Sequence, residues 1–101
     1  MSNPLIEKPE DHQTEVAVTV RTPAGASHSF TFKLDELVTQ AVFQSIRYFV
    51  ERSELAPGDY GLALVREGRA EDLTDTSRLD DYRIVNGDVL HLIPEAPQVD
   101  G

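Results

Sequence analysis

Alternating apolar and polar positions predict two β-strands near the start of the chain. The apolar positions are Val16, Val18 and Val20 in the first run and Phe30, Phe32 and Leu34 in the second. Period-two alternation is typical of a strand with one buried face. Between the runs lie residues 22–26, where Pro23 and Gly25 favour a turn. We therefore expect a β-hairpin.

The apolar period then changes to three and four residues. The apolar positions of this segment are Val38, Ala41, Val42, Ile46 and Phe49. Such spacing predicts an amphipathic helix, which we place over residues 35–52 with Asp35 as its N-cap. Pro57 and Gly58 follow and favour the end of the element. Two further aromatic residues, Phe43 and Tyr48, flank the stripe, and we expect them to cover an edge of the sheet.

Three more strands complete the predicted fold. They are residues 60–66, with Ala63 and Val65 outward, a short strand near Leu73, and residues 89–93 after the turn signal Asn-Gly-Asp. A helix after a hairpin can bury its stripe only against the sheet, so the pattern predicts a two-layer α+β domain. The expected core is Val16, Val18, Phe30, Phe32, Leu34, Val42, Ile46, Leu62, Leu64, Ile84, Leu90 and Leu92.

Composition excludes several classes of function. The 101 residues suffice for one domain, and the net charge of −9, without clustered Lys or Arg, argues against nucleic-acid binding. The chain has no apolar run of membrane-spanning length. It also has no cysteine, which excludes disulfides and thiolate zinc sites and is consistent with the cytoplasm. We expect a cytoplasmic protein that does not associate with membranes.

Nothing in the residue pattern indicates catalysis, a metal or a cofactor. His12, His28 and His91 have no ligand spacing. The carboxylate pairs at residues 71–72 and 80–81 stand in polar loops without a histidine or nucleophile, so we interpret them as solvated surface. We therefore expect a protein that is not an enzyme.

One stretch near the C-terminus resembles ubiquitin. Residues 79–84 read Leu-Asp-Asp-Tyr-Arg-Ile and are followed by Leu-His-Leu at 90–92, while residues 55–59, Leu-Ala-Pro-Gly-Asp, match ubiquitin's proline-containing loop between helix and strand. The resemblance covers roughly residues 15–93. It implies the ubiquitin-like β-grasp, a mixed sheet of four or five strands with one helix packed across it. We accordingly divide the chain into a flexible extension (1–14), the β-grasp domain (15–94) and a flexible tail (95–101).

The same resemblance implies a function. Gly101 is similar to the glycine at which ubiquitin-type modifiers are activated, which would make the chain a protein modifier joined to its target by an isopeptide bond. Because Asp100 precedes a single glycine in an acidic tail, we expect dedicated partners: an E1-like activating enzyme, an E2-like conjugating enzyme and a deconjugating peptidase. Bacterial ubiquitin-like proteins encoded beside such enzymes, some in antiphage operons, are the group that the chain resembles.

Ubiquitin is held by its partners at an apolar patch on the exposed sheet face, and Val65, His91 and Ile93 match its strand positions here. At the place of the leucine that ubiquitin's first turn contributes to this patch, the chain has only Ala24 or Ala26. An alternative is that these are scattered surface residues without a role. Two other functions remain open: an interaction module that is never conjugated, and a sulfur carrier that bears a thiocarboxylate.

Overall fold

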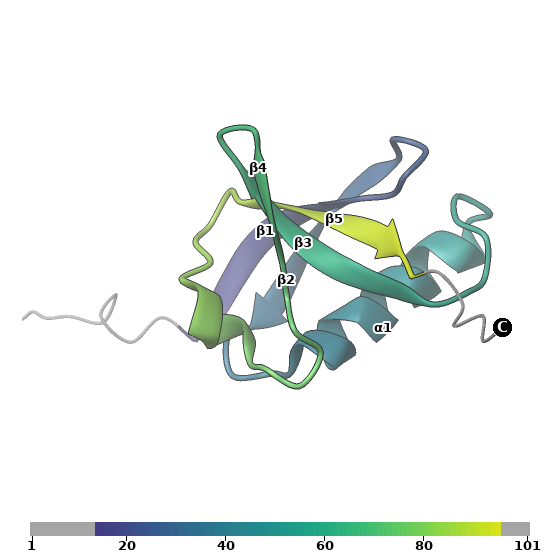
Figure 1. Cartoon of the computed structure of the whole chain (residues 1–101). Helices are drawn as coiled ribbons and strands as arrows, with labels where there is room; N and C mark the ends of the chain where they lie inside the picture. The colour runs from purple at the N-terminus through teal and green to yellow at the C-terminus, as the bar shows by residue number, and fades with distance from the viewer. Residues whose placement is uncertain (1–13, 96–101) are drawn as a thin grey trace, which may run out of the picture.

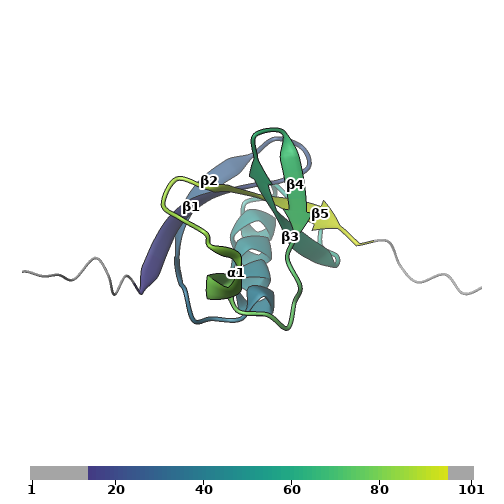
Figure 2. The ribbon, with the colours of Figure 1, turned by 60° about the vertical axis from the view of Figure 1, so that its left-hand side comes forward.

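Within the part of the chain that the structure describes, one mixed β-sheet is covered on one face by a single α-helix. The computed structural model describes residues 14–95. Its elements are β1 (Glu15–Arg21), β2 (Ser27–Lys33), α1 (Val38–Glu51), β3 (Tyr60–Arg66), β4 (Arg69–Asp72), the 3-10 helix η2 (Leu79–Tyr82) and β5 (Val89–Pro94). The strand order is β2-β1-β5-β3-β4, and only β1 and β5 run parallel (Figure 1). Figure 2 shows α1 on the concave side of the sheet. The predicted α+β architecture is confirmed.

The hairpin turn closes as the sequence predicts. The N–H of Thr22 donates to the carbonyl of Ala26 (2.8 Å), and the Thr22 hydroxyl accepts from the N–H of Ala26 (3.0 Å). Gly25 has a φ of 101°, a conformation that side chains with a Cβ adopt only at a cost. These bonds fix the register in which β1 and β2 pair from Glu15–Lys33 to Arg21–Ser27.

The helix begins later than predicted, and Asp35 is not its N-cap. Leu37 is still extended (φ −74°, ψ 149°) and α1 starts at Val38. The segment before it pairs with the chain around η2: the N–H of Val38 donates to the carbonyl of Ser77, and the N–H of Leu79 to the carbonyl of Glu36. These contacts hold the segment straight, and backbone carbonyls replace the expected carboxylate at the first helical amides.

The core lies between the sheet and α1, and most of the expected residues are buried in it. Three of them, Phe30, Leu34 and Ile46, are only half-buried and pack against its margin. Six further apolar residues that the expected core did not include are also buried: Val20, Val38, Ala41, Phe49, Leu73 and Leu79. Val20 lies on the expected face of β1, and Val38, Ala41 and Phe49 lie on the expected helix stripe. Leu73 directly follows the short strand β4. The sixth, Leu79, is completely buried at the start of η2.

The two aromatic residues that flank the helix stripe differ in their surroundings. Tyr48 covers the β2 edge as predicted: its ring stacks on His28 at 3.9 Å and meets Phe30 edge-on. Arg52 lies over the Tyr48 ring at 4.2 Å. Phe43 covers nothing, since 69% of it is exposed, so that expectation is wrong.

Candidate interaction surface on the outer sheet face

The predicted patch residues lie on the face of the sheet that α1 does not cover. In the antiparallel pairing of β3 with β5, Val65 stands opposite Val89, Ala63 opposite His91, and Gly61 opposite Ile93. Residues directly opposite one another in such a pair share a face. The alternate positions on both strands, including Leu62 and Leu92, are buried in the core. Strand alternation thus brings residues 65, 91 and 93 together from segments far apart in sequence.

Their exposure is uneven. Ile93 is 42% exposed, while Val65 and His91 are half-buried between their neighbours. Val89, also half-buried, belongs to the same face, although sequence reasoning did not include it. The signal was present, because Val89 is two residues from His91 in a strand and therefore points to the same side. We call Val65, Val89, His91 and Ile93 the outer-face patch.

Neighbouring residues limit this patch. Ala63 lies on the outer face as predicted but is only 1% exposed. It is paired with Asp72 on one side and His91 on the other, both of which are much larger. In the first turn Ala24 is exposed but Ala26 packs against the core, so the turn adds little apolar surface. The outer-face patch is accordingly compact and centred on β3 and β5.

An ion pair beside the patch fixes the start of β5. The Arg66 guanidinium donates to both carboxylate oxygens of Asp88, at 3.1 and 2.7 Å, and also to the carbonyl of Arg83 at 2.7 Å. Arg83 has a left-handed backbone with φ 53°. The Asp88 carboxylate also accepts from the N–H of Val85 (2.9 Å). The hydrogen bonds from Arg66 hold the pKa of Asp88 below its usual value.

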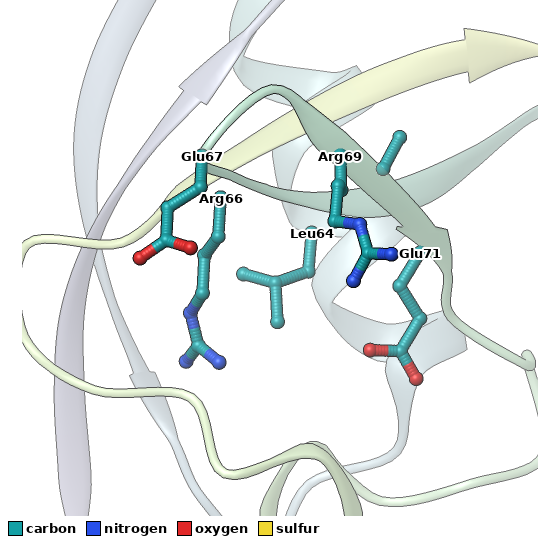
Figure 3. Close-up of a pocket in the computed structure, with 6 residues that line it drawn as sticks. Leu64, Arg66, Glu67, Arg69 and Glu71 are labelled. Carbon is teal, nitrogen blue, oxygen red and sulfur yellow. The ribbon is translucent and has the colours of Figure 1, made fainter.

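A polar hollow of about 510 Å³ lies along the β3–β4 hairpin. Figure 3 shows Leu64 between Arg66 on one strand and Arg69 on the other, with Glu67 and Glu71 at the margins. Arg66 is already engaged by Asp88. The lining holds charges of both signs, its two glutamates are exposed, and it contains no serine, threonine, histidine or lysine. We assign it no chemistry.

The carboxylate pairs at residues 71–72 and 80–81 lie on an edge strand and in the 3-10 helix η2, respectively. Asp80 forms an ion pair with the Arg78 side chain, and the Asp81 carboxylate accepts from the N–H of Arg78 at 2.9 Å. Glu71 and Asp72 are exposed on the edge strand β4. The Tyr82 hydroxyl accepts from the N–H of Thr74 at 2.8 Å, which ties η2 to the chain after β4. The residues 71–72 and 80–81 therefore contribute to the surface and to turn geometry.

Histidines and other ligand types do not gather within residues 14–95. His28 stacks on Tyr48 and His91 lies on the outer sheet face. No three His, Asp or Glu side chains of the described segment are placed to hold a metal ion. In the same segment no helix is long and apolar enough to cross a membrane. Residues 1–13 of the predicted extension, with His12, and residues 96–101 of the predicted tail, with Gly101, lie outside the described residues.

Comparison with known proteins shows the fold. No family model matches the sequence, and no curated protein does. Solved structures match over most of the chain. A protein designed de novo on the basis of ubiquitin has a TM-score of 0.62 at 18% identity, over 87% of this chain and 98% of its own. The ubiquitin-like domain of PLXNC1 reaches 0.65 at 18% identity, over 80% and 99%. A structure described as molecular mimicry of SUMO reaches 0.57 at 16% identity, over 81% and 94%. The chain has a ubiquitin-like β-grasp fold.

Proposed function

We propose that this chain is a ubiquitin-like module that acts by being bound, with no catalytic activity of its own. The observation that carries the proposal is the outer-face patch: four apolar or amphipathic side chains from two adjacent strands point away from the core on one face. Backbone pairing of β3 with β5 holds these residues in place before any partner arrives. A preformed surface loses little conformational freedom on binding, which favours affinity.

Ile93 is the part of the patch that a partner would bury most. It is 42% exposed beside the half-buried His91, so a partner can cover apolar area without unpacking the core. Each Å² of apolar surface removed from water contributes about 25 cal/mol. Polar side chains surround the patch on β1 and β4, among them Thr19 and Asp72. An apolar centre with a polar rim is the usual anatomy of a transient interface.

Replacing Ile93 with Asp tests the interaction. The variant should lose binding to a cognate partner, which we would seek by co-purification with the products of neighbouring genes, while the melting temperature stays near that of the wild type. Val85→Asp provides the control, because Val85 is 56% exposed but lies in the loop before β5. Equal loss in both variants, or none in Ile93→Asp, would place the interface elsewhere.

We further propose that the module is a protein modifier, joined through the Gly101 carboxylate to a target amine by dedicated E1-like and E2-like enzymes and removed by a peptidase. A bacterial antiphage pathway in the cytoplasm is the proposed setting. The support is the ubiquitin-like fold together with the place where the sheet ends: β5 stops at Pro94, and Glu95 is exposed at the rim. The described segment thus ends at an exposed position and not within the core.

Deleting Gly101 tests conjugation, once intact mass has shown that the mature chain ends there. Co-expression of the wild type with its neighbouring genes should yield adducts heavier by about one domain, and the deletion should abolish them. Gln98→Ala is the tail control and should retain them. If the wild type forms no adducts but still binds partners, the chain is a non-conjugated interaction module. A thiocarboxylate found by intact mass would instead identify a sulfur carrier.

A further inference from the structure

One side of α1, next to the loop that leads into β3, carries an apolar groove. Phe43, Ile46 and Val50 follow one another at intervals of three and four residues, which places them along one side of the helix. With Pro57 and Gly58 from the following loop they line a hollow of about 520 Å³. Phe43 contributes almost nothing to the fold, since 69% of its surface is exposed. Exposed apolar side chains gathered at a groove are typical of a docking site.

This groove continues into an acidic hollow at the end of the sheet. Pro57 and Gly58 also line the second hollow, of about 360 Å³, together with Asp59, Tyr60, Pro94 and Glu95. The N–H of Glu95 donates to the carbonyl of Asp59 at 2.9 Å, which fixes the two residues side by side. Both residues are exposed. The Glu95 carboxylate oxygen lies 2.9 Å from where a Cβ of Gly61 would stand, so it is held close over β3.

The charged residues around the groove indicate which kind of partner segment it can bind. On the helix side of the groove Arg47 and Glu51 form an exposed ion pair at 3.5 Å and largely neutralise one another. At the loop side Asp59 and Glu95 form no ion pair within residues 14–95, and they add two negative charges. The whole chain carries −9, so a second copy would be repelled and a basic segment attracted.

We propose that this surface docks a short basic amphipathic segment of a partner protein. One large apolar side chain of the segment fills the groove between Phe43, Val50 and Pro57, and an adjacent Lys or Arg reaches Asp59 and Glu95. The groove is formed by α1 and the loop after it, whereas the outer-face patch is formed by β3 and β5. The Glu95 carboxylate lies over Gly61, which pairs with Ile93, so the acidic end of this surface adjoins the outer-face patch.

The test is an NMR titration of the ¹⁵N-labelled full chain with two synthetic probe peptides. One carries Leu followed by two Arg in a Gly/Ser segment, and the other replaces both Arg with Glu. The basic peptide should shift the amide signals of residues 43–59 and of Glu95. It should bind roughly fivefold or more tightly than the acidic peptide, the size that two exposed ion pairs supply.

Three variants assign the contacts. Phe43→Ser should weaken the basic peptide about tenfold without unfolding the chain, because Phe43 is exposed. Asp59→Asn combined with Glu95→Gln should remove the preference for the basic peptide over the acidic one. Val85→Asp, an exposed position in the loop before β5, should change neither. The proposal is overturned if the signals of residues 43–59 do not move, if both peptides bind wild type equally, or if Phe43→Ser binds normally. Shifts of the same signals on dilution of the protein alone would assign the groove to a second copy and also overturn it.

Discussion

Asp88 is the side chain on which the loop before β5 converges. Its carboxylate accepts hydrogen bonds from the Arg66 guanidinium and from the N–H of Val85, and its carbonyl accepts from the N–H of Thr19 at 2.9 Å. The Asp88 side chain is only 10% exposed, so these bonds are partly shielded from water. They favour the ionised form and lower its pKa, chiefly through Arg66. A carboxylate with a depressed pKa stabilises the folded state above its ordinary pKa.

Replacing Asp88 with Asn should therefore lower the free energy of unfolding near neutral pH by about 1–3 kcal/mol, the usual value of hydrogen bonds to a charged group. The difference between wild type and variant should persist above the ordinary aspartate pKa. It should shrink as the pH falls through the lowered pKa of Asp88, because the wild type then loses the same charge. Urea denaturation over a range of pH measures this. Asp59→Asn, an exposed carboxylate, is the control, and equal losses in the two would contradict the prediction.

At the scale of the element, α1 presents two different apolar sides. The core side carries five buried residues, among them Phe49 at 0% exposure. The other side carries Phe43, Ile46 and Val50 along the groove. Ile46 packs against the margin of the core and also lines the groove, so it belongs to both sides. An apolar stripe of this width exceeds what packing against one sheet requires.

Two alanine substitutions on this helix should separate the sides. Phe49→Ala should lower the free energy of unfolding by about 3–5 kcal/mol, since it removes a buried ring and leaves a cavity. Phe43→Ala should change it by about 0.5 kcal/mol or less, as for an exposed position. Thermal and urea unfolding of both variants checks this. A large loss in Phe43→Ala would mean that the groove is part of the core.

The whole molecule is strongly acidic for its size. Eighteen acidic side chains face nine basic ones, and three ion pairs are formed among the described residues. Two of these pairs, Arg47–Glu51 and Arg78–Asp80, are well exposed on both sides and contribute little. Repulsion among the remaining carboxylates therefore opposes the compact state.

Salt should stabilise this protein. Raising the ionic strength from about 0.01 M to about 0.15 M shortens the screening length from about 30 Å to about 8 Å, which weakens the long-range repulsion. The melting temperature should rise, as calorimetry can measure. In the double variant Glu71→Gln, Asp72→Asn, which removes two exposed charges from β4, the rise should be smaller. A melting temperature that falls with salt would show that ion pairs outweigh repulsion.

The sequence alone determined the layers of this fold. Alternation at period two and the change to a helical period are local properties, and each forces a given set of side chains to one side of its element. They sufficed to predict the two-layer sheet and helix, most of the core, and the shared side of His91 and Ile93. Val89 followed from the same rule and was overlooked. The hydrogen bond that the Tyr82 hydroxyl accepts from the N–H of Thr74 also follows from a local rule, because a tyrosine in such a loop needs a partner for its hydroxyl.

Only the tertiary structure decided the features that join distant segments. The helix starts at Val38 because backbone around residue 77 straightens the segment before it, and no local preference of Asp35 reveals that. The patch forms because β3 pairs with β5, which brings Val65 beside Val89 across more than twenty residues. Arg66 and Asp88 meet for the same reason. Pairing between remote strands depends on the whole fold, so periodicity can say which way a residue points but not which residues it will meet.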